Sequence, residues 1–275
     1  MNIEQKKERI LSLNPFSKIL GSIKDIKPIY HELATTGNVF LITSEKGKSY
    51  KISFYDDVDK ARVVESHVLK CRRLLPKYHG REGNLLLFDW IKGEVLTEIL
   101  DLDTCHKLGV IYGEIHKLND LKKGKTSSSK LKKYYQRLCD TNYFGQKTLD
   151  KVKDEFDRIQ SILSRHIILE MNDANPANFI MKETGEILIV DEEALNHNIQ
   201  GRGLIGLVKR FGKEQKKAFW KGYKEKHPHD YFTRDYETAL THMGAVLSVQ
   251  HRLHKYGPEH HKTKEAIKEF LKYFG

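Results

Sequence analysis

Three polar side chains in the second half of the chain have the types and spacing for phosphoryl-transfer chemistry. Asp173 is followed five positions later by Asn178, and Asp191 lies a further thirteen positions on. One carboxylate can orient an attacking hydroxyl and take its proton, while an amide oxygen and a second carboxylate hold magnesium against triphosphate oxygens. The alternative is that all three are ordinary turn residues, because Asp and Asn favour turns for local hydrogen-bonding reasons.

Short apolar runs on both sides of these residues would fix their positions. The run 167–169 precedes Asp173, and the runs 178–181 and 187–190 are separated by a Glu-Thr-Gly-Glu turn, which predicts a β-hairpin. Pro176 stiffens the loop between Asp173 and the hairpin. We therefore expect the three oxygen-bearing side chains to gather at one end of this hairpin.

The predicted secondary structure changes near residue 91, from mainly strands to mainly helices. Before it, 39–42 and 50–54 predict a β-hairpin, 58–75 has helical apolar spacing, and 84–90 predicts a strand. After Gly93 the pattern is mainly helical. The sequence thus predicts an α+β protein with a β-rich lobe over residues 1–91 and a mainly helical lobe over 92–275 that contains the catalytic hairpin and the acceptor site.

The pattern Asp173-x-x-x-x-Asn178, followed by Asp191, resembles the catalytic and metal-binding loops of protein-kinase-like enzymes. It is most similar to the branch of aminoglycoside phosphotransferases and choline kinases. The resemblance implies that Asp173 is the catalytic base and that Asn178 and Asp191 bind Mg²⁺ beside ATP. Met171 and Asn172 stand where this branch has His and Gly, which leaves the exact family open.

The same resemblance assigns roles in the first lobe. Lys51 lies in the second strand of the predicted hairpin and would contact the ATP phosphates. Glu65, fourteen residues on and inside the predicted helix, would hold Lys51 in place. Glu192 and Glu193, next to Asp191, suit either metal binding or a solvent-exposed surface.

Two further segments resemble nucleotide-binding parts of that fold. The run 87–94 is similar to the hinge that offers backbone groups to adenine, which points to Asp89 and Ile91. The turn 34–38 would cover the phosphates with Gly37 and Asn38, although it holds a single glycine. Gly47-Lys48-Ser49 looks like the end of a P-loop, but it lies in a strand-turn-strand pattern and lacks the first glycine.

Composition narrows the class of protein. The charged fraction of 31% and the absence of a long apolar run are typical of a globular protein without a membrane span. Three widely spaced cysteines form neither a disulfide framework nor a zinc set, so we expect a cytoplasmic location. The net charge of +11 suits an anionic partner, but no nucleic-acid-binding signature accompanies it. A peripheral contact with a membrane surface stays open.

Taken together, the sequence predicts an ATP- and Mg²⁺-dependent phosphotransferase that acts on a hydroxyl of a small molecule or sugar. One rival is a kinase of a lipopolysaccharide or other glycan sugar, and another is an atypical protein kinase, although no long activation segment follows Asp191. Alternatives of another class are a non-catalytic kinase-like scaffold and a basic nucleic-acid-binding protein.

Overall fold

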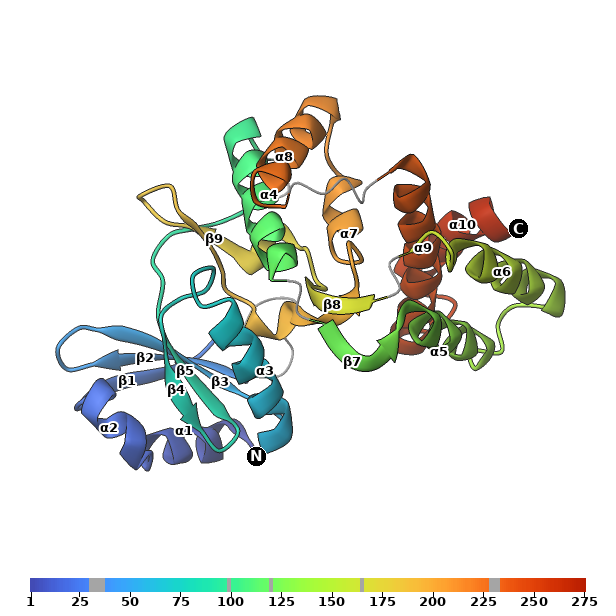
Figure 1. Cartoon of the computed structure of the whole chain (residues 1–275). Helices are drawn as coiled ribbons and strands as arrows, with labels where there is room; N and C mark the ends of the chain where they lie inside the picture. The colour runs from blue at the N-terminus through green and yellow to red at the C-terminus, as the bar shows by residue number, and fades with distance from the viewer. Residues whose placement is uncertain (30–37, 98–99, 119–120, 164–165, 228–232) are drawn as a thin grey trace. The chain divides into compact units, whose positions relative to one another are not determined.

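The computed structural model describes residues 1–29, 38–97, 100–118, 121–163, 166–227 and 233–275 (Figure 1). The chain divides into two compact units: residues 1–97 with 176–195, and residues 98–175 with 196–275. The predicted α+β class is confirmed. The hairpin over residues 176–195 groups with the first unit, whereas the sequence assigned it to the second lobe. The reason is that the hairpin pairs with β6 (Glu94–Val95) at the end of the N-terminal segment.

An antiparallel sheet of five strands forms the centre of the first unit. Its order is β1-β2-β3-β5-β4, with bounds Ile23–Pro28, Val39–Ser44, Ser49–Phe54, Leu85–Asp89 and Tyr78–Glu82 in that order. The predicted hairpin is confirmed as β2 and β3, and the predicted strand after the helix is β5. Gly47, with φ of 74°, makes the left-handed turn between β2 and β3.

The two faces of this sheet have different covers. Helices α1 (Ile3–Leu11) and α2 (Asn14–Leu20), which the sequence did not predict, pack against one face. The apolar cluster there comprises Ile10, Leu13, Phe16, Leu20, Phe40, Ile42, Tyr50, Ile52, Phe54, Leu85 and Leu87. Because side chains alternate along a strand, Lys51 and Ser53 of β3 point to the opposite face. Helix α3 (Val58–Lys70) packs beside β5 and is shorter than the predicted helix.

The predicted catalytic hairpin consists of β9 (Phe179–Met181) and β10 (Ile187–Ile189). With β6 it makes a separate three-stranded sheet in the order β10-β9-β6. Gly93 lies just before β6, and a Cβ there would come within 2.4 Å of the Met181 carbonyl oxygen. Only glycine therefore allows this close approach of the two backbones.

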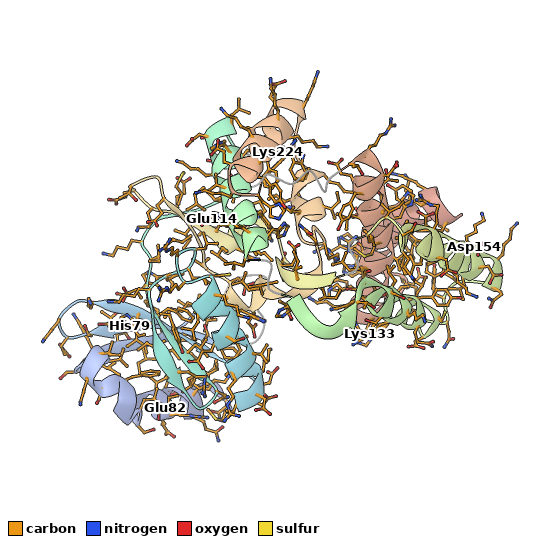
Figure 2. All side chains as sticks on the ribbon, viewed as in Figure 1. His79, Glu82, Glu114, Lys133, Asp154 and Lys224 are labelled. Atoms are coloured by element: carbon orange, nitrogen blue, oxygen red, sulfur yellow. The ribbon has the colours of Figure 1, made fainter. Side chains whose placement is uncertain are left out.

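In the second unit, α4 (Leu102–Lys117) and α8 (Lys213–Lys226) pack side by side (Figure 1). A Cβ at Gly109 would lie 2.0 Å from the Phe219 carbonyl oxygen, so small residues set this close packing. Figure 2 shows the side chains of Glu114 and Lys224 on these two helices.

The remaining elements of the second unit form a small sheet and a helical core. The sheet has the order β11-β8-β7, with bounds Leu195–Ile199, His166–Met171 and Leu121–Thr126. The helices are α5 (Ser127–Cys139), α6 (Gln146–Ile159), α7 (Leu204–Val208), α9 (Arg234–Tyr256) and α10 (His261–Phe274). The helices expected in this region are thus present. Across the described ranges, no helix is both long enough and apolar enough to cross a bilayer.

Candidate active site

Lys51 reaches from β3 to the segment that contains Asp191. Its ammonium nitrogen donates to the Val190 carbonyl oxygen at 2.6 Å and to Glu192 Oε2 at 2.5 Å. The same nitrogen lies 5.7 Å from the centre of the Phe88 ring, whose residue is directly opposite Lys51 in the sheet. The two oxygen contacts lie on either side of Asp191, so Lys51 holds that segment at both flanks.

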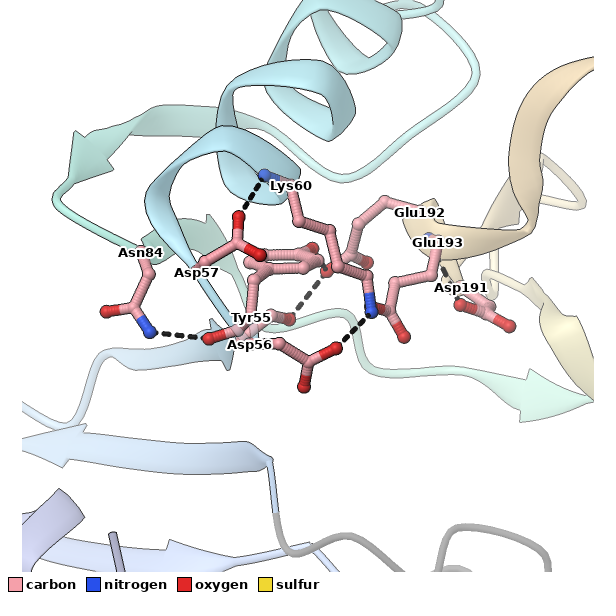
Figure 3. Close-up of polar contacts among 9 residues, drawn as sticks. Tyr55, Asp56, Asp57, Lys60, Asn84, Asp191, Glu192 and Glu193 are labelled. Atoms are coloured by element: carbon pink, nitrogen blue, oxygen red, sulfur yellow. Dashed lines mark hydrogen bonds and ion pairs between the residues drawn. The ribbon is translucent and has the colours of Figure 1, made fainter.

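Glu192 is the centre of a buried polar cluster. Its Oε1 atom accepts a hydrogen bond from Ser53 Oγ at 2.5 Å. The same atom accepts a second one from the Tyr55 hydroxyl at 2.8 Å (Figure 3). Burial alone would raise the pKa of Glu192, but the Lys51 ammonium and the Ser53 hydrogen bond outweigh burial and hold this pKa below its usual value. Burial and the Glu192 carboxylate raise the pKa of Tyr55, which keeps its hydroxyl a neutral donor.

Among the described residues, no hydrogen bond or ion pair joins Lys51 and Glu65, and the role that the sequence gave Glu65 stays a prediction. Glu65 lies on α3 as expected, but its carboxylate accepts from the Tyr78 hydroxyl at 2.5 Å and from Arg81 Nε at 2.6 Å, both on β4. Burial opposes ionisation of Glu65, yet these two partners lower its pKa. The carboxylate is therefore engaged with the edge of the sheet, and Lys51 pairs with Glu192 instead.

The hairpin places Asn178 and Asp191 on adjacent rungs. Val190 N donates to the Asn178 carbonyl oxygen at 2.9 Å, which continues the β9–β10 register and puts Asp191 one residue beyond that pair. Asp191 then caps a single turn of 3₁₀ helix, η2 (Glu192–Ala194), by accepting from Glu193 N at 3.2 Å (Figure 3).

Contacts from α3 hold the same segment. His67 Nδ1 lies 3.0 Å from the Leu195 carbonyl oxygen, and Lys60 Nζ lies 2.9 Å from Glu193 Oε1. Ile189 N donates to the Leu74 carbonyl oxygen at 2.8 Å. The segment 189–195 is thus held by contacts to α3 and to the residues after it, which gives the Asp191 side chain a rigid support.

The donor set of this segment suits magnesium. An amide oxygen and a carboxylate oxygen are the hard ligands that Mg²⁺ prefers, and Mg²⁺ commonly takes its other ligands from phosphates and water. Within the described ranges no three His, Cys, Asp or Glu side chains gather as a metal site. The assignment of Asn178 and Asp191 as Mg²⁺ ligands stays a prediction.

Asp173 lies in the second unit, directly after β8. Its side chain is exposed, and its Oδ1 accepts from Asn175 N at 3.3 Å. The preceding Asn172 accepts a hydrogen bond from Asn198 Nδ2. A Cβ at Gly203 would lie 1.6 Å from the Met171 carbonyl oxygen. The start of the loop is therefore held against the segment that follows β11.

A buried contact between Glu170 and His116 lies next to the start of this loop. Glu170 Oε2 accepts from the Gly201 backbone N–H at 2.6 Å and lies 2.9 Å from His116 Nε2. His116 in turn contacts the Tyr223 hydroxyl through Nδ1 at 2.8 Å. Burial, with the Glu170 and Asp173 carboxylates, raises the pKa of Tyr112, which places that phenol in their field.

Besides Lys51, four residues are predicted to contact the nucleotide, and three of them lie in the described part of the chain. Gly37 lies outside the described residues, while Asn38 Oδ1 accepts from Lys6 Nζ at 2.6 Å. Asp89 Oδ1 lies 2.6 Å from His79 Nε2, and the Asp89 N–H donates to the Lys77 carbonyl oxygen. A backbone contact to adenine would then fall to Ile91, the next predicted residue. The roles of all four stay predictions.

The sequence left the role of Glu192 open, and a recognisable signal was present. Lys51 and Ser53 alternate along β3 and Tyr55 directly follows it, so polar side chains recur at every second position of this segment. Polar groups on a buried face need partners. The partner that all three share is Glu192, which is 3% exposed.

Solved structures resemble this chain in fold. Neither the protein-family profiles nor the curated protein sequences contain a match to this chain. The choline kinase LicA from Streptococcus pneumoniae superposes with a TM-score of 0.71 at 15% identity, covering 98% of this chain and 100% of that one.

Two other solved structures show the same likeness. A choline kinase from Cryptosporidium parvum Iowa II gives a TM-score of 0.66 at 13% identity, with 97% and 94% of the two chains covered. The macrolide 2'-phosphotransferase MphH from Brachybacterium faecium gives 0.64 at 11% identity, with 96% and 98% covered. The chain therefore shares the fold of these choline kinase and macrolide phosphotransferase structures.

Proposed function

We propose that this protein is an ATP-dependent phosphotransferase that moves the γ-phosphate of ATP to a hydroxyl group of a small molecule or sugar. The observation that carries the proposal is the Lys51 ammonium, which bonds Val190 and Glu192 on the two sides of Asp191. A phosphate-binding cation is thereby attached to the segment that offers a metal-binding carboxylate. A solved structure of similar fold, LicA in complex with AMP, adds support for nucleotide binding.

In the proposed reaction, Lys51 binds the ATP phosphates, and Asn178 and Asp191 hold Mg²⁺, which would neutralise phosphate charge. Asp173 orients the acceptor hydroxyl. The bond between the γ-phosphorus and the bridging oxygen of ADP breaks as the acceptor oxygen bonds to phosphorus, and the hydroxyl proton passes to Asp173. Gly37 and Asn38 remain proposed phosphate contacts, and Asp89 and Ile91 remain proposed adenine contacts.

Two observations support the proposed classes of acceptor. Solved structures of similar fold are named for choline, ethanolamine, macrolides and an aminoglycoside, so small molecules with hydroxyl groups come first. The net charge of +11 favours an anionic acceptor, which keeps glycan sugars as the second candidate.

The test is ATP consumption with Mg²⁺ against choline, ethanolamine, aminoglycosides, macrolides, free sugars and lipid-linked glycans. We expect turnover with one of these classes and at least a ~10²-fold loss of kcat in Asp173→Asn, because the proton acceptor is removed. Asp191→Ala should also lose Mg²⁺-dependent turnover.

Asp59→Asn is the matched control, since Asp59 is an exposed carboxylate that pairs only with its helical neighbour Arg62. Near-normal turnover of Asp173→Asn would remove its assigned role. A wild-type protein that gains no thermal stability from ATP and Mg²⁺, and consumes ATP with none of the acceptors, would overturn the proposed activity.

A further inference from the structure

We propose that Glu192 is the positioning residue for the phosphate-binding lysine and, through that lysine, for Asp191. This inference rests on the proposed phosphotransferase function. It concerns a residue next to the metal-binding aspartate, not the glutamate on α3 to which the sequence comparison gave this task.

The Lys51 ammonium makes two hydrogen bonds to the segment that contains Asp191. A lysine ammonium has three N–H donors. Val190 O and Glu192 Oε2 take two of them, at 2.6 and 2.5 Å, and one donor is left for a phosphate oxygen. Because Val190 and Glu192 flank Asp191, the same two contacts fix the lysine and the backbone on both sides of the aspartate.

The Glu192 side chain is itself held in place by two hydroxyl groups. Ser53 and Tyr55 both donate to its Oε1, which leaves Oε2 directed at Lys51. The Glu192 side chain is 4% exposed and that of Lys51 is 12% exposed. A carboxylate held by two hydroxyls and closed off from solvent keeps one rotamer, and positioning residues need that property.

Glu65, the other candidate for positioning Lys51, is bonded elsewhere. Both oxygens of Glu65 already accept short hydrogen bonds from β4, one from Tyr78 and one from Arg81. These two bonds direct the Glu65 carboxylate toward β4, and within the part of the chain that the structure describes no hydrogen bond or ion pair joins it to Lys51. Glu192, in contrast, contacts the lysine directly.

The experiment compares three variants in the full-length protein: Glu192→Gln, Glu65→Gln and Glu183→Gln. Glu183 is an exposed residue in the turn of the β9–β10 hairpin and serves as the control. Glu192→Gln places an amide beside Lys51 and should lower kcat by about 100-fold, since a small misplacement of a phosphate-binding group has this effect. Glu65→Gln should lower kcat less than tenfold, and Glu183→Gln should leave it unchanged.

A double-mutant cycle separates positioning from general structural support. Affinity for ATP with Mg²⁺ is measured in Lys51→Met, Glu192→Gln and the double variant. If Glu192 acts through Lys51, the second substitution adds almost nothing to the first; if it supports the fold alone, the effects add. Tyr55→Phe removes one donor to Glu192 and keeps the carboxylate, so it supplies a milder loss of kcat should Glu192→Gln fold poorly.

Three outcomes decide the matter. A larger loss in Glu65→Gln than in Glu192→Gln overturns the inference while leaving the phosphotransferase activity in place. Additive losses in the cycle overturn it as well. A wild-type chain that neither binds nor consumes ATP removes the proposed function first, and that result is read before any variant is compared.

Discussion

Two buried glutamates, one in each unit, lie close in sequence to the predicted catalytic residues, and they are satisfied in different ways. Glu192 follows Asp191 and accepts from Lys51, Ser53 and Tyr55, so both of its oxygens are bonded. Glu170 precedes Asp173 by three positions and uses Oε2 for two partners, while its Oε1 has no hydrogen-bond partner among the described residues.

The two carboxylates differ in what they bond. Glu192 bonds a lysine that is proposed to touch substrate. Glu170 bonds His116 and the Gly201 backbone N–H, close to the start of the Asp173 loop. Burial costs both carboxylates their hydration, but bonds to both oxygens offset this cost for Glu192, whereas one oxygen of Glu170 has no such compensation in the described part of the chain. Replacing Glu192 should therefore cost more stability than replacing Glu170.

The largest expected effect tests this order directly. Glu192→Ala should lower the free energy of unfolding by about 3–5 kcal/mol, because it leaves the Lys51 ammonium uncompensated. Glu170→Ala should lower it by about 1–3 kcal/mol, because two donors lose their acceptor but an unbonded oxygen also disappears. Urea unfolding of both variants gives the comparison, and a greater loss in Glu170→Ala would reverse it.

An intermediate effect is expected at Gly203, which supports the same loop as Glu170. A Cβ at this position would lie 1.6 Å from the Met171 carbonyl oxygen, so Gly203→Ala must displace backbone. We expect a loss of about 1–3 kcal/mol in unfolding free energy, together with reduced turnover from a displaced Asp173. Gly206→Ala is the control, since a Cβ at Gly206 meets nothing within 4 Å. Equal stability of the two variants would show that the loop is not held there.

The smallest effect concerns Glu65 and pH. Tyr78 and Arg81 overcome its burial and lower its pKa in the folded protein, so its contribution to stability is present above its unfolded pKa and is lost as the pH falls through the folded pKa. Glu65→Gln should cost under about 1 kcal/mol at neutral pH. The difference in melting temperature from wild type should shrink in acid, and a difference that grows there would contradict the assigned sign.

Much of the fold could be predicted because local patterns determined it. The β2–β3 hairpin, helix α3 and the β9–β10 hairpin follow from short-range alternation and turn residues. Helices α1 and α2 were missed, although Asn2 and Gln5 form a capping box and apolar residues recur up to Leu20.

The partner of Lys51 could not be predicted in the same way. Its distance from Glu192 along the chain is 141 residues, whereas Glu65 is near and on a helix flank that the spacing of Ala61 and Val68 marks as half-buried. What decides the pairing is β4. This polar strand has no apolar alternation, and it draws Glu65 to Tyr78 and Arg81. Sequence periodicity gives the face of a helix but not the side chains that meet it.

The assignment of residues 176–195 to the first unit has a consequence for biosynthesis. The segment that neutralises Lys51 leaves the ribosome after the whole first part of the second unit, since Glu192 lies 141 residues downstream. At elongation speeds of about 5–20 residues per second this is a delay of roughly seven to thirty seconds. During that time the nascent sheet has its α1–α2 cover but must keep the Lys51 face exposed or transiently shielded, so a translating chain would be most vulnerable to misassembly at the surface that later binds the Asp191 segment.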